Sequence, residues 1–473
     1  MTLRERLRAL EVATRPEHPD LVAALARRWE ELPDHVRTPN QMLGRRTAGC
    51  EGTRGVFPRC DLACTPCYHS REANRVRTDG DHTEAEVDRQ MAYLRRVRGP
   101  GQNAQLIGGE VALLSPEDHA RALLAMEAHA RKPMSMSHGD FDYDHLVALV
   151  RAGGFRHLAF GGHFDSLMFG RRGIRRASCE RDLNPYRARF AEMFRRLERE
   201  HGVTHYLAHN MTVTPRNIGE VAQVIRDCRE MGFRMFSFQP AAYVGNSSRW
   251  KDELRAISGE DVWREIERGA GGRLHWRALQ IGDERCNRTA YGGWAGDRYV
   301  PLLDEDDPRD ARWLASFLRA FGGMDFVAPP ALLAARVVRG LGREPRALPR
   351  LAGWAARFAR RTRGRRFRPV TFVMHSFMDA RDVRPAWEAL ERGQLSDDPR
   401  IRTTQERLQA CSYAMAHPDE DRLVPACVQH SVLDPLENLR LQRELPRVAV
   451  RDPRERRASP GLPGQRPREE APG

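Results

Sequence analysis

Hydrophobic and polar positions in the first half of the chain follow two alternating spacings. Short apolar runs predict strands at residues 104–107, 134–137, 155–160, 206–213 and 233–238. Between these runs, apolar residues at helical spacing predict helices at residues 83–98, 116–131, 144–152, 184–201 and 217–231. Strands that alternate with helices in this way indicate βαβ units and therefore a parallel sheet.

The boundaries of several elements carry local signals. Thr83 and Glu86 fit an S/T-x-x-E capping box at the start of a helix. Gly99 with Pro100, and later Gly232, are typical helix stops. Residues 53–58 predict one more short strand, directly before a group of cysteines.

About six βα units fit between residues 53 and 245. The pattern therefore predicts an α/β fold, a partial (β/α)6 TIM-type barrel with N-terminal helices and a C-terminal extension. We expect four parts: an N-terminal helical segment at 1–45, the barrel at 46–245, a substrate or auxiliary region at 246–445, and a tail at 446–473. The tail is rich in Pro, Arg, Gly and Glu and predicts disorder.

Composition limits the function classes. A chain of 473 residues suggests two or three domains. It has no run of 18 apolar residues, and its charged N-terminus lacks the apolar core of a signal peptide, so we expect a cytoplasmic protein. Nine cysteines in a reducing compartment are typical of metal ligands or inert thiols.

The formal charge of +14 comes almost entirely from arginine, because Lys132 and Lys251 are the only lysines. This skew is more typical of coding bias than of nucleic-acid binding. No zinc-finger, RNP-like or helix-turn-helix signature accompanies it, so we expect no nucleic-acid partner.

Three cysteines, Cys60, Cys64 and Cys67, lie within eight residues at C-x3-C-x2-C spacing. A [4Fe–4S] cluster normally takes four thiolates, so three would leave one iron open to another ligand. The alternative is a zinc site in which Cys50 supplies the fourth ligand. Structural zinc sites usually show two close cysteine pairs, and no second pair follows here.

The sequence Gly108-Gly109-Glu110 follows the predicted strand at residues 104–107. Glycines let the backbone approach a ligand closely, and a carboxylate can accept hydrogen bonds from an ammonium group. This sequence and the cysteine motif resemble two elements of the radical S-adenosylmethionine (SAM) superfamily.

The resemblance implies that Cys60, Cys64 and Cys67 hold a [4Fe–4S] cluster whose open iron binds SAM, and that Gly108, Gly109 and Glu110 contact the SAM amino group. It also implies an electron donor such as reduced flavodoxin or ferredoxin. The implied reaction is reductive cleavage of SAM to a 5′-deoxyadenosyl radical that abstracts hydrogen from a substrate. One position departs from the family, since Pro66 stands before the third cysteine where an aromatic residue is common.

Other candidate contacts follow the strands, because ligands of such barrels lie at the carboxyl ends of the strands. We predict cofactor contacts for His163 and Asn210. Further candidates for SAM or substrate are Ser137, His138, Asp165, Thr212 and Gln239.

Three later cysteines, Cys286, Cys411 and Cys427, are candidate ligands of an auxiliary metal centre, a second iron–sulfur cluster or another metal. Cys411 and Cys427 flank a predicted turn at residues 419–421, so a hairpin would bring them together. Cys50, His417 or the substrate would be the fourth partner. The alternative is that these are inert buried cysteines, as we expect for Cys179 and Cys228. The C-terminal sequence also loosely resembles a branch with pterin-modifying and tetraether-lipid synthases.

Near residues 330–368, Leu351, Trp354 and Phe358 form an apolar stripe beside many arginines. A basic amphipathic helix of this kind is typical of a membrane surface, which would favour a hydrophobic or lipid substrate and peripheral membrane contact. The alternative is a helix packed on the barrel. The leading hypothesis is therefore a radical SAM enzyme acting on an unidentified substrate, and the second is a non-catalytic zinc-binding or scaffolding protein.

Overall fold

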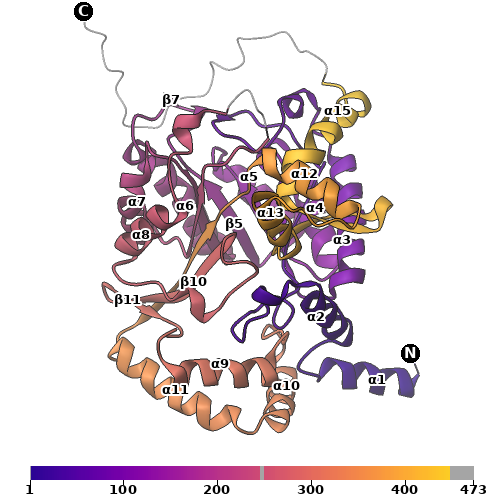
Figure 1. The fold of residues 1–473 in the computed structure, drawn as a ribbon, viewed down its shortest axis with the longest axis vertical. Helices are drawn as coiled ribbons and strands as arrows, with labels where there is room; N and C mark the ends of the chain where they lie inside the picture. The colour runs from indigo at the N-terminus through magenta and orange to yellow at the C-terminus, as the bar shows by residue number, and fades with distance from the viewer. Residues whose placement is uncertain (1, 246–249, 448–473) are drawn as a thin grey trace, which may run out of the picture.

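A single curled sheet of eleven strands organises the computed structural model, which describes residues 2–245 and 250–447 (Figure 1). Six parallel strands form its centre, and each pairs with the next one along the chain. They are β1 (Cys50–Gly52), β3 (Asn103–Leu106), β4 (Lys132–Ser137), β5 (His157–His163), β8 (Thr204–Val213) and β9 (Met235–Pro240).

A helix follows each of these strands. The six helices are α3 (Gly80–Arg98), α4 (Pro116–Ala128), α5 (Tyr143–Gly153), α6 (Asn184–His201), α7 (Val221–Met231) and α8 (Gly259–Ala270). The sequential order of parallel strands with intervening helices is the partial (β/α)6 barrel that the sequence predicts. That prediction is confirmed.

Two local predictions were wrong. Residues 53–58 form no strand, because β1 ends at Gly52. The Thr53 hydroxyl donates to the Ile107 carbonyl at 2.6 Å, and this side-chain bond takes the place of further backbone hydrogen bonds to β3. Thr83 does not cap α3. The cap is Asp79, whose side chain accepts from the His82 N–H, and Thr83 lies inside the helix with its hydroxyl on the Val56 carbonyl.

The C-terminal half contributes strands to the same sheet. Parallel strands β12 (Phe367–His375) and β13 (Tyr413–His417) pair with β9 and β1, one at each edge of the six. Antiparallel strands extend both edges: β10 (Asn287–Ala295), β11 (Arg298–Pro301) and β14 (Arg422–Pro425). The division at residues 245 and 246 therefore stays a prediction, and from residue 448 the predicted disordered tail lies outside the described residues.

The sheet curls around a cavity of about 2020 Å³, which we call the barrel cavity. Alternate residues face it, as strand geometry requires. On β8 and β9 these are Tyr206, Ala208, Asn210, Thr212, Met235, Ser237 and Gln239. The intervening residues, such as Leu207 and Phe236, pack outward against the helices. Many of the inward side chains are small or polar and leave the interior hollow. The interior of a closed TIM barrel, in contrast, is filled by large side chains.

Helices cover the amino-terminal end of the barrel (Figure 1). They are α1 (Leu3–Ala13), α2 (Pro19–Glu31), α9 (Pro308–Phe321), α10 (Pro330–Arg343) and α11 (Ala347–Thr362). The remaining helices lie on the side of the sheet that ends in β13 and β14. They are α12 (Ala380–Glu391), α13 (Pro399–Gln409), α14 (Ala426–Val428) and α15 (Asp434–Glu444). No helix of the described residues is long and apolar enough to span a bilayer.

The apolar stripe of α11 faces the protein. The Trp354 ring stacks on Trp313 of α9 with centroids 6.1 Å apart, and its Nε1 donates to the Leu302 carbonyl at 3.0 Å. Arg357 and Arg361 pair with the buried Asp310 at 2.6 and 2.8 Å. This stripe is therefore a packing surface, and the interpretation of α11 as a membrane-surface helix through these residues is wrong.

Candidate functional site

The loop that carries Cys60, Cys64 and Cys67 follows β1 at the carboxyl end of the barrel strands. Its central part, β2 (Ala63–Cys64), pairs with β6 (Met168–Arg171), which pairs in turn with β7 (Ile174–Arg176). The Thr65 N–H also donates to the Leu167 carbonyl at 3.2 Å. The segment after β5 therefore holds the cysteine loop from one side.

The two glycines after β3 hold the loop from the other side. The Gly109 N–H donates to the Phe57 carbonyl at 2.7 Å, and the Glu110 N–H donates to the Arg59 carbonyl at 2.8 Å. A Cβ at Gly109 would lie 1.9 Å from the Arg59 carbonyl oxygen. The glycines are needed because the backbone just before Cys60 passes directly against them.

The Glu110 carboxylate is buried and bonded within the protein. It accepts from the Ser137 hydroxyl at 2.8 Å, from the His138 N–H at 2.8 Å and from the Ala112 N–H at 3.0 Å. Neither Glu110 nor the two glycines line the barrel cavity. In this structure Glu110 positions Ser137 and His138, and its contact with a SAM amino group stays a prediction.

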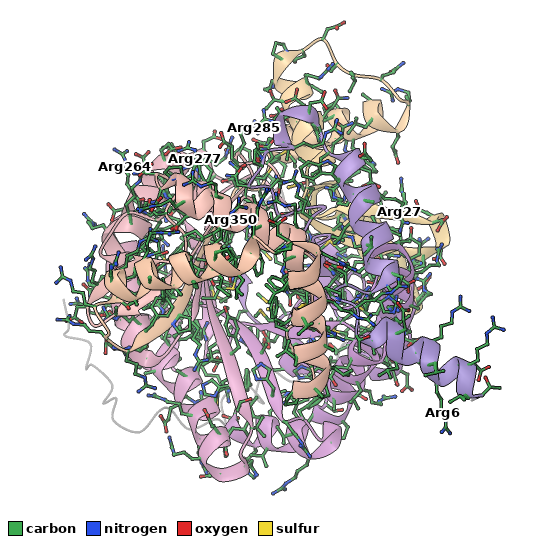
Figure 2. The ribbon with its side chains drawn as sticks, turned by 90° about the horizontal axis from the view of Figure 1, so that it is seen from below. Arg6, Arg27, Arg264, Arg277, Arg285 and Arg350 are labelled. Carbon is green, nitrogen blue, oxygen red and sulfur yellow. The ribbon has the colours of Figure 1, made fainter. Side chains whose placement is uncertain are left out.

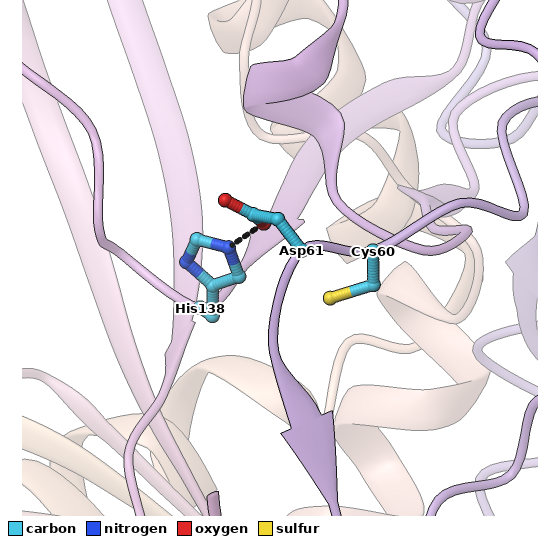
Figure 3. Close-up of side chains that lie close together, drawn as sticks. All are labelled: Cys60, Asp61 and His138. Carbon is cyan, nitrogen blue, oxygen red and sulfur yellow. Dashed lines mark hydrogen bonds and ion pairs between the residues drawn. The ribbon is translucent and has the colours of Figure 1, made fainter. Parts of the chain in front are cut away.

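Cys60 lies in a small polar cluster with Asp61 and His138 (Figure 3). The His138 Nε2 is 2.8 Å from an Asp61 carboxylate oxygen, and the ligand atoms of all three residues lie within 4.8 Å of one another. Burial alone would lower the pKa of His138, but Glu110 and Asp61 outweigh it and the pKa is raised. Burial and then Glu110 raise the pKa of Cys60, so a thiolate there needs a compensating positive charge.

Two of the three cysteines lie on the wall of the barrel cavity. All three are half-buried, and Cys64 and Cys67 line the cavity. Three thiolates can hold a [4Fe–4S] cluster with one iron left open, or a zinc ion together with a fourth ligand.

A buried arginine beside this loop has hydrogen-bond donors without partners, although its Nη2 donates to the His163 carbonyl at 3.3 Å. Arg171 is 4% exposed, and within the described part of the chain its Nε and Nη1 are buried without a hydrogen-bond partner. Burial lowers its pKa, and the opposing charges that act on it include Asp140, Cys64 and Glu110. A buried cation with free donors next to Cys64 fits a negatively charged group, such as a thiolate-bound cluster or the carboxylate of SAM.

Replacing Arg171 with Met should therefore change two quantities in opposite directions. The apoprotein should gain about 1–3 kcal/mol in the free energy of unfolding, because two buried donors without hydrogen-bond partners, Nε and Nη1, are removed. SAM affinity of the reconstituted protein should fall roughly ten- to a hundredfold, the worth of a charged hydrogen bond. Urea unfolding and equilibrium dialysis measure the two. Destabilisation with unchanged SAM affinity would show instead that Arg171 only supports the fold.

Four of the other predicted contacts line the barrel cavity at the carboxyl ends of β5, β8 and β9. They are His163, Asn210, Thr212 and Gln239. Asp165 lies behind His163, with 2.6 Å between its carboxylate and Nε2. Burial would raise the pKa of Asp165, but His163 and two backbone N–H groups outweigh it and the pKa is lowered. Ser137, His138 and Asp165 do not line the cavity, and their contact with SAM or substrate stays a prediction.

The sequence analysis missed a histidine–carboxylate pair on the C-terminal helices. The Nδ1 of His430 is 2.7 Å from the Asp434 carboxylate, its ring lies 4.5 Å from that of Tyr68, and it lines the barrel cavity. Asp434 orients the imidazole so that Nε2 remains for a ligand or a proton. The four-residue spacing of His430 and Asp434 was the available signal.

The structure also brings Cys286, Cys411 and Cys427 to one part of the cavity wall. Cys411 and Cys427 flank the β13–β14 hairpin, as predicted. Burial raises the pKa of Cys427, and the nearby thiols of Cys411 and Cys286 raise it further. The three thiols are therefore neighbours. Arg407 Nε donates to the Cys286 sulfur at 3.1 Å.

The two proposed fourth partners differ in position. Cys50 lines the same cavity, whereas His417 does not, and the His417 Nε2 is 2.6 Å from the Gln429 side-chain oxygen. Of these two, therefore, Cys50 shares the cavity wall with the three thiols, and a role as fourth ligand stays a prediction.

No protein-family model and no curated protein matches the chain. Solved structures that resemble it include Streptococcus suis SuiB bound to S-adenosylmethionine, with 16% identity, a TM-score of 0.30 and 46% of each chain covered. Native anSMEcpe with bound AdoMet has 15% identity and a TM-score of 0.31, over 46% of this chain and 57% of that one.

Coproporphyrinogen III oxidase (HemN) from Escherichia coli, described as a radical SAM enzyme, has 15% identity and a TM-score of 0.30, over 52% of this chain and 54% of that one. The chain thus aligns with about half the length of these proteins.

Proposed function

We propose that the chain is a radical SAM enzyme. Cys60, Cys64 and Cys67 would hold a [4Fe–4S] cluster with one open iron, and the SAM bound there would lie at the carboxyl end of the barrel strands. The observation that carries the proposal is the position of Cys64 and Cys67 on the wall of the barrel cavity, with His163 and Asn210 on the same wall.

The bound cluster would supply an electron, received from a donor such as reduced flavodoxin or ferredoxin, that cleaves SAM to methionine and a 5′-deoxyadenosyl radical, which abstracts hydrogen from the substrate. The chain's own residues would do the rest. Gly109 and Glu110 fix the cysteine loop, Arg171 offsets negative charge beside Cys64, and His163 and Asn210 orient SAM or substrate.

The substrate proposal rests on the cavity. Its volume of about 2020 Å³ exceeds the roughly 300–1,000 Å³ of ordinary ligand pockets. At the amino-terminal end of the barrel, which we call its lower part, the cavity lies beside α9 and α11. Large apolar side chains line it there, including Trp313, Leu314, Phe317 and Trp354. A polar upper part and an apolar lower part favour an amphiphilic substrate with a long hydrophobic portion.

SAM cleavage tests the proposed function without knowledge of the substrate. The protein is reconstituted with iron and sulfide without oxygen, then mixed with dithionite and SAM, and 5′-deoxyadenosine is measured by chromatography. We expect product that increases with time and requires the reductant. A protein that carries its full iron and sulfide but forms no 5′-deoxyadenosine would contradict the proposal.

We propose a second metal centre at Cys286, Cys411 and Cys427. Its support is that the three thiols line one cavity wall, from the residue before β10, the segment before β13 and α14, beside the half-buried guanidinium of Arg407. A thiolate set of this kind suits iron–sulfur or zinc, and the positive charge of Arg407 would offset part of its negative charge.

Replacing these three cysteines together with alanine tests the second centre. We expect the reconstituted variant to lose about half of its bound iron if both sites hold a [4Fe–4S] cluster, since each cluster binds about four iron atoms. The control is Cys179→Ala, which removes a thiol outside the barrel cavity. Equal metal content, zinc included, in the triple variant and the wild type would show that these cysteines bind none.

A further inference from the structure

The α1 helix carries an apolar face that no part of the described chain covers. Leu3, Leu7 and Leu10 lie at i, i+4 and i+7, so they share one side of the helix, and each is 55–74% exposed. None of the residues of α1 is buried. Scattered exposed leucines are ordinary, but a continuous stripe on one helix points to an interaction surface.

Neighbouring segments extend this surface. Arg336 and Arg339 of α10 donate to backbone carbonyls of Ala13 and Glu11 at 2.9 and 3.2 Å, so the end of α1 rests against α10. Large apolar side chains are exposed along the segment that contains α10: Phe326, Val327, Val338 and Leu348. Seen from below, α1 with Arg6 and the helices that lead to Arg350 lie on the side facing the viewer (Figure 2). We use the name basal face for the surface formed by the α1 leucines, by Phe326, Val327, Val338 and Leu348, and by the arginines of α1, α10 and α11.

The arginines of the basal face divide into two groups. Those that hold the helices together have acidic partners, as in the pair of Arg343 with Glu17 at 2.6 Å. The others are exposed and, among the residues that the structure describes, have no carboxylate within 4 Å. They are Arg4, Arg6, Arg8, Arg346 and Arg360. An exposed apolar stripe flanked by unpaired cations complements an anionic lipid surface, whereas a second copy would bring like charges together.

The barrel cavity reaches this face. Val327, which is 80% exposed, also lines the cavity, together with Val12 and Ala13 from the last turn of α1 and Pro16 from the connection to α2. The same cavity reaches Cys64 and Cys67 at its other end. A hydrophobic chain held in a bilayer could therefore enter at the base of the barrel, next to the docked helix.

We propose that the basal face docks on an anionic lipid bilayer, with Leu3, Leu7 and Leu10 in the acyl region and the unpaired arginines at the headgroups. The docking itself is independent of SAM cleavage. If the proposed function also holds, this face delivers a membrane lipid to the barrel cavity.

Co-sedimentation with vesicles tests the docking. Wild-type protein should sediment with vesicles of phosphatidylcholine mixed with phosphatidylglycerol, much less with phosphatidylcholine alone, and less as salt is raised. The variant Leu3→Gln, Leu7→Gln, Leu10→Gln should lose at least about tenfold in partitioning, because the apolar stripe is removed while helix propensity is kept. The variant Arg4→Gln, Arg6→Gln, Arg8→Gln should lose most of the preference for anionic vesicles.

The matched control is Leu395→Gln, Leu436→Gln, Leu439→Gln, which replaces three exposed leucines elsewhere and should bind like the wild type. Thermal unfolding and 5′-deoxyadenosine formation should be unchanged in all variants, so a failure of docking is distinct from a failure of the proposed function. Absence of wild-type binding, or equal binding by the α1 leucine variant, would overturn the proposal. So would a dimer that the α1 leucine variant dissociates, because a second copy would then cover the face.

Discussion

Replacing Cys60, Cys64 and Cys67 together with alanine should abolish 5′-deoxyadenosine formation. The three thiols are the only cysteines on the loop between β1 and α3, and two of them line the barrel cavity. Without thiolates the loop cannot hold a cluster, and without a cluster no electron reaches SAM. Product should fall to the level seen without protein, and the variant should lose the iron and sulfide of this site.

The control for this variant is Cys179→Ala, which should retain wild-type product formation and iron content. The cysteines of the loop are not packed in a hydrophobic core cluster, so the triple variant should also keep its secondary structure. SAM cleavage that persists in the triple variant would show that another group performs the reduction.

Replacing Gly109 with alanine should have the second-largest effect. The new Cβ would lie 1.9 Å from the Arg59 carbonyl oxygen, and backbone on both sides prevents an easy adjustment. We expect the free energy of unfolding to fall by about 1–3 kcal/mol or more, as in overpacked cores. Because Arg59 directly precedes Cys60, iron content should fall as well. Urea unfolding and iron analysis measure the two effects.

Gly219→Ala is the matched control, because a Cβ at Gly219 would meet no atom within 4 Å. It should leave the free energy of unfolding unchanged or raise it by up to about 1 kcal/mol, and it should leave iron content unchanged. If Gly109→Ala behaved like this control, the close contact between the glycines and the cysteine loop would not matter for the site.

The barrel was predictable because its information is local. Apolar runs and helical spacing placed β3, β4, β5, β8 and β9 within a few residues, and helix stops such as Gly99 and Gly232 were correct. The errors also have local causes. At residues 53–58, a hydrogen bond from the Thr53 side chain takes the place of backbone hydrogen bonds between strands. At the start of α3, the nearby Asp79 caps the helix in place of Thr83.

The site was only partly predictable, because it depends on contacts between distant segments. The cysteine motif is compact in sequence, so its chemistry could be recognised from spacing. Arg171 and His430 reach the cysteine loop from segments that are far away along the chain, and no spacing connects them to it. The stripe of Leu351, Trp354 and Phe358 illustrates the same limit. Its helical periodicity predicts that α11 has an apolar face, but it does not predict whether protein or membrane covers that face.

Metal analysis of the Cys286→Ala, Cys411→Ala, Cys427→Ala variant tests whether Cys60, Cys64 and Cys67 hold an iron–sulfur cluster, because the second cysteine group can then no longer bind metal. After reconstitution without oxygen it should contain about four iron and four sulfide per chain, and added SAM should change the electron paramagnetic resonance spectrum of the reduced cluster. About one zinc per chain with neither iron nor sulfide would contradict the account and favour a structural zinc site.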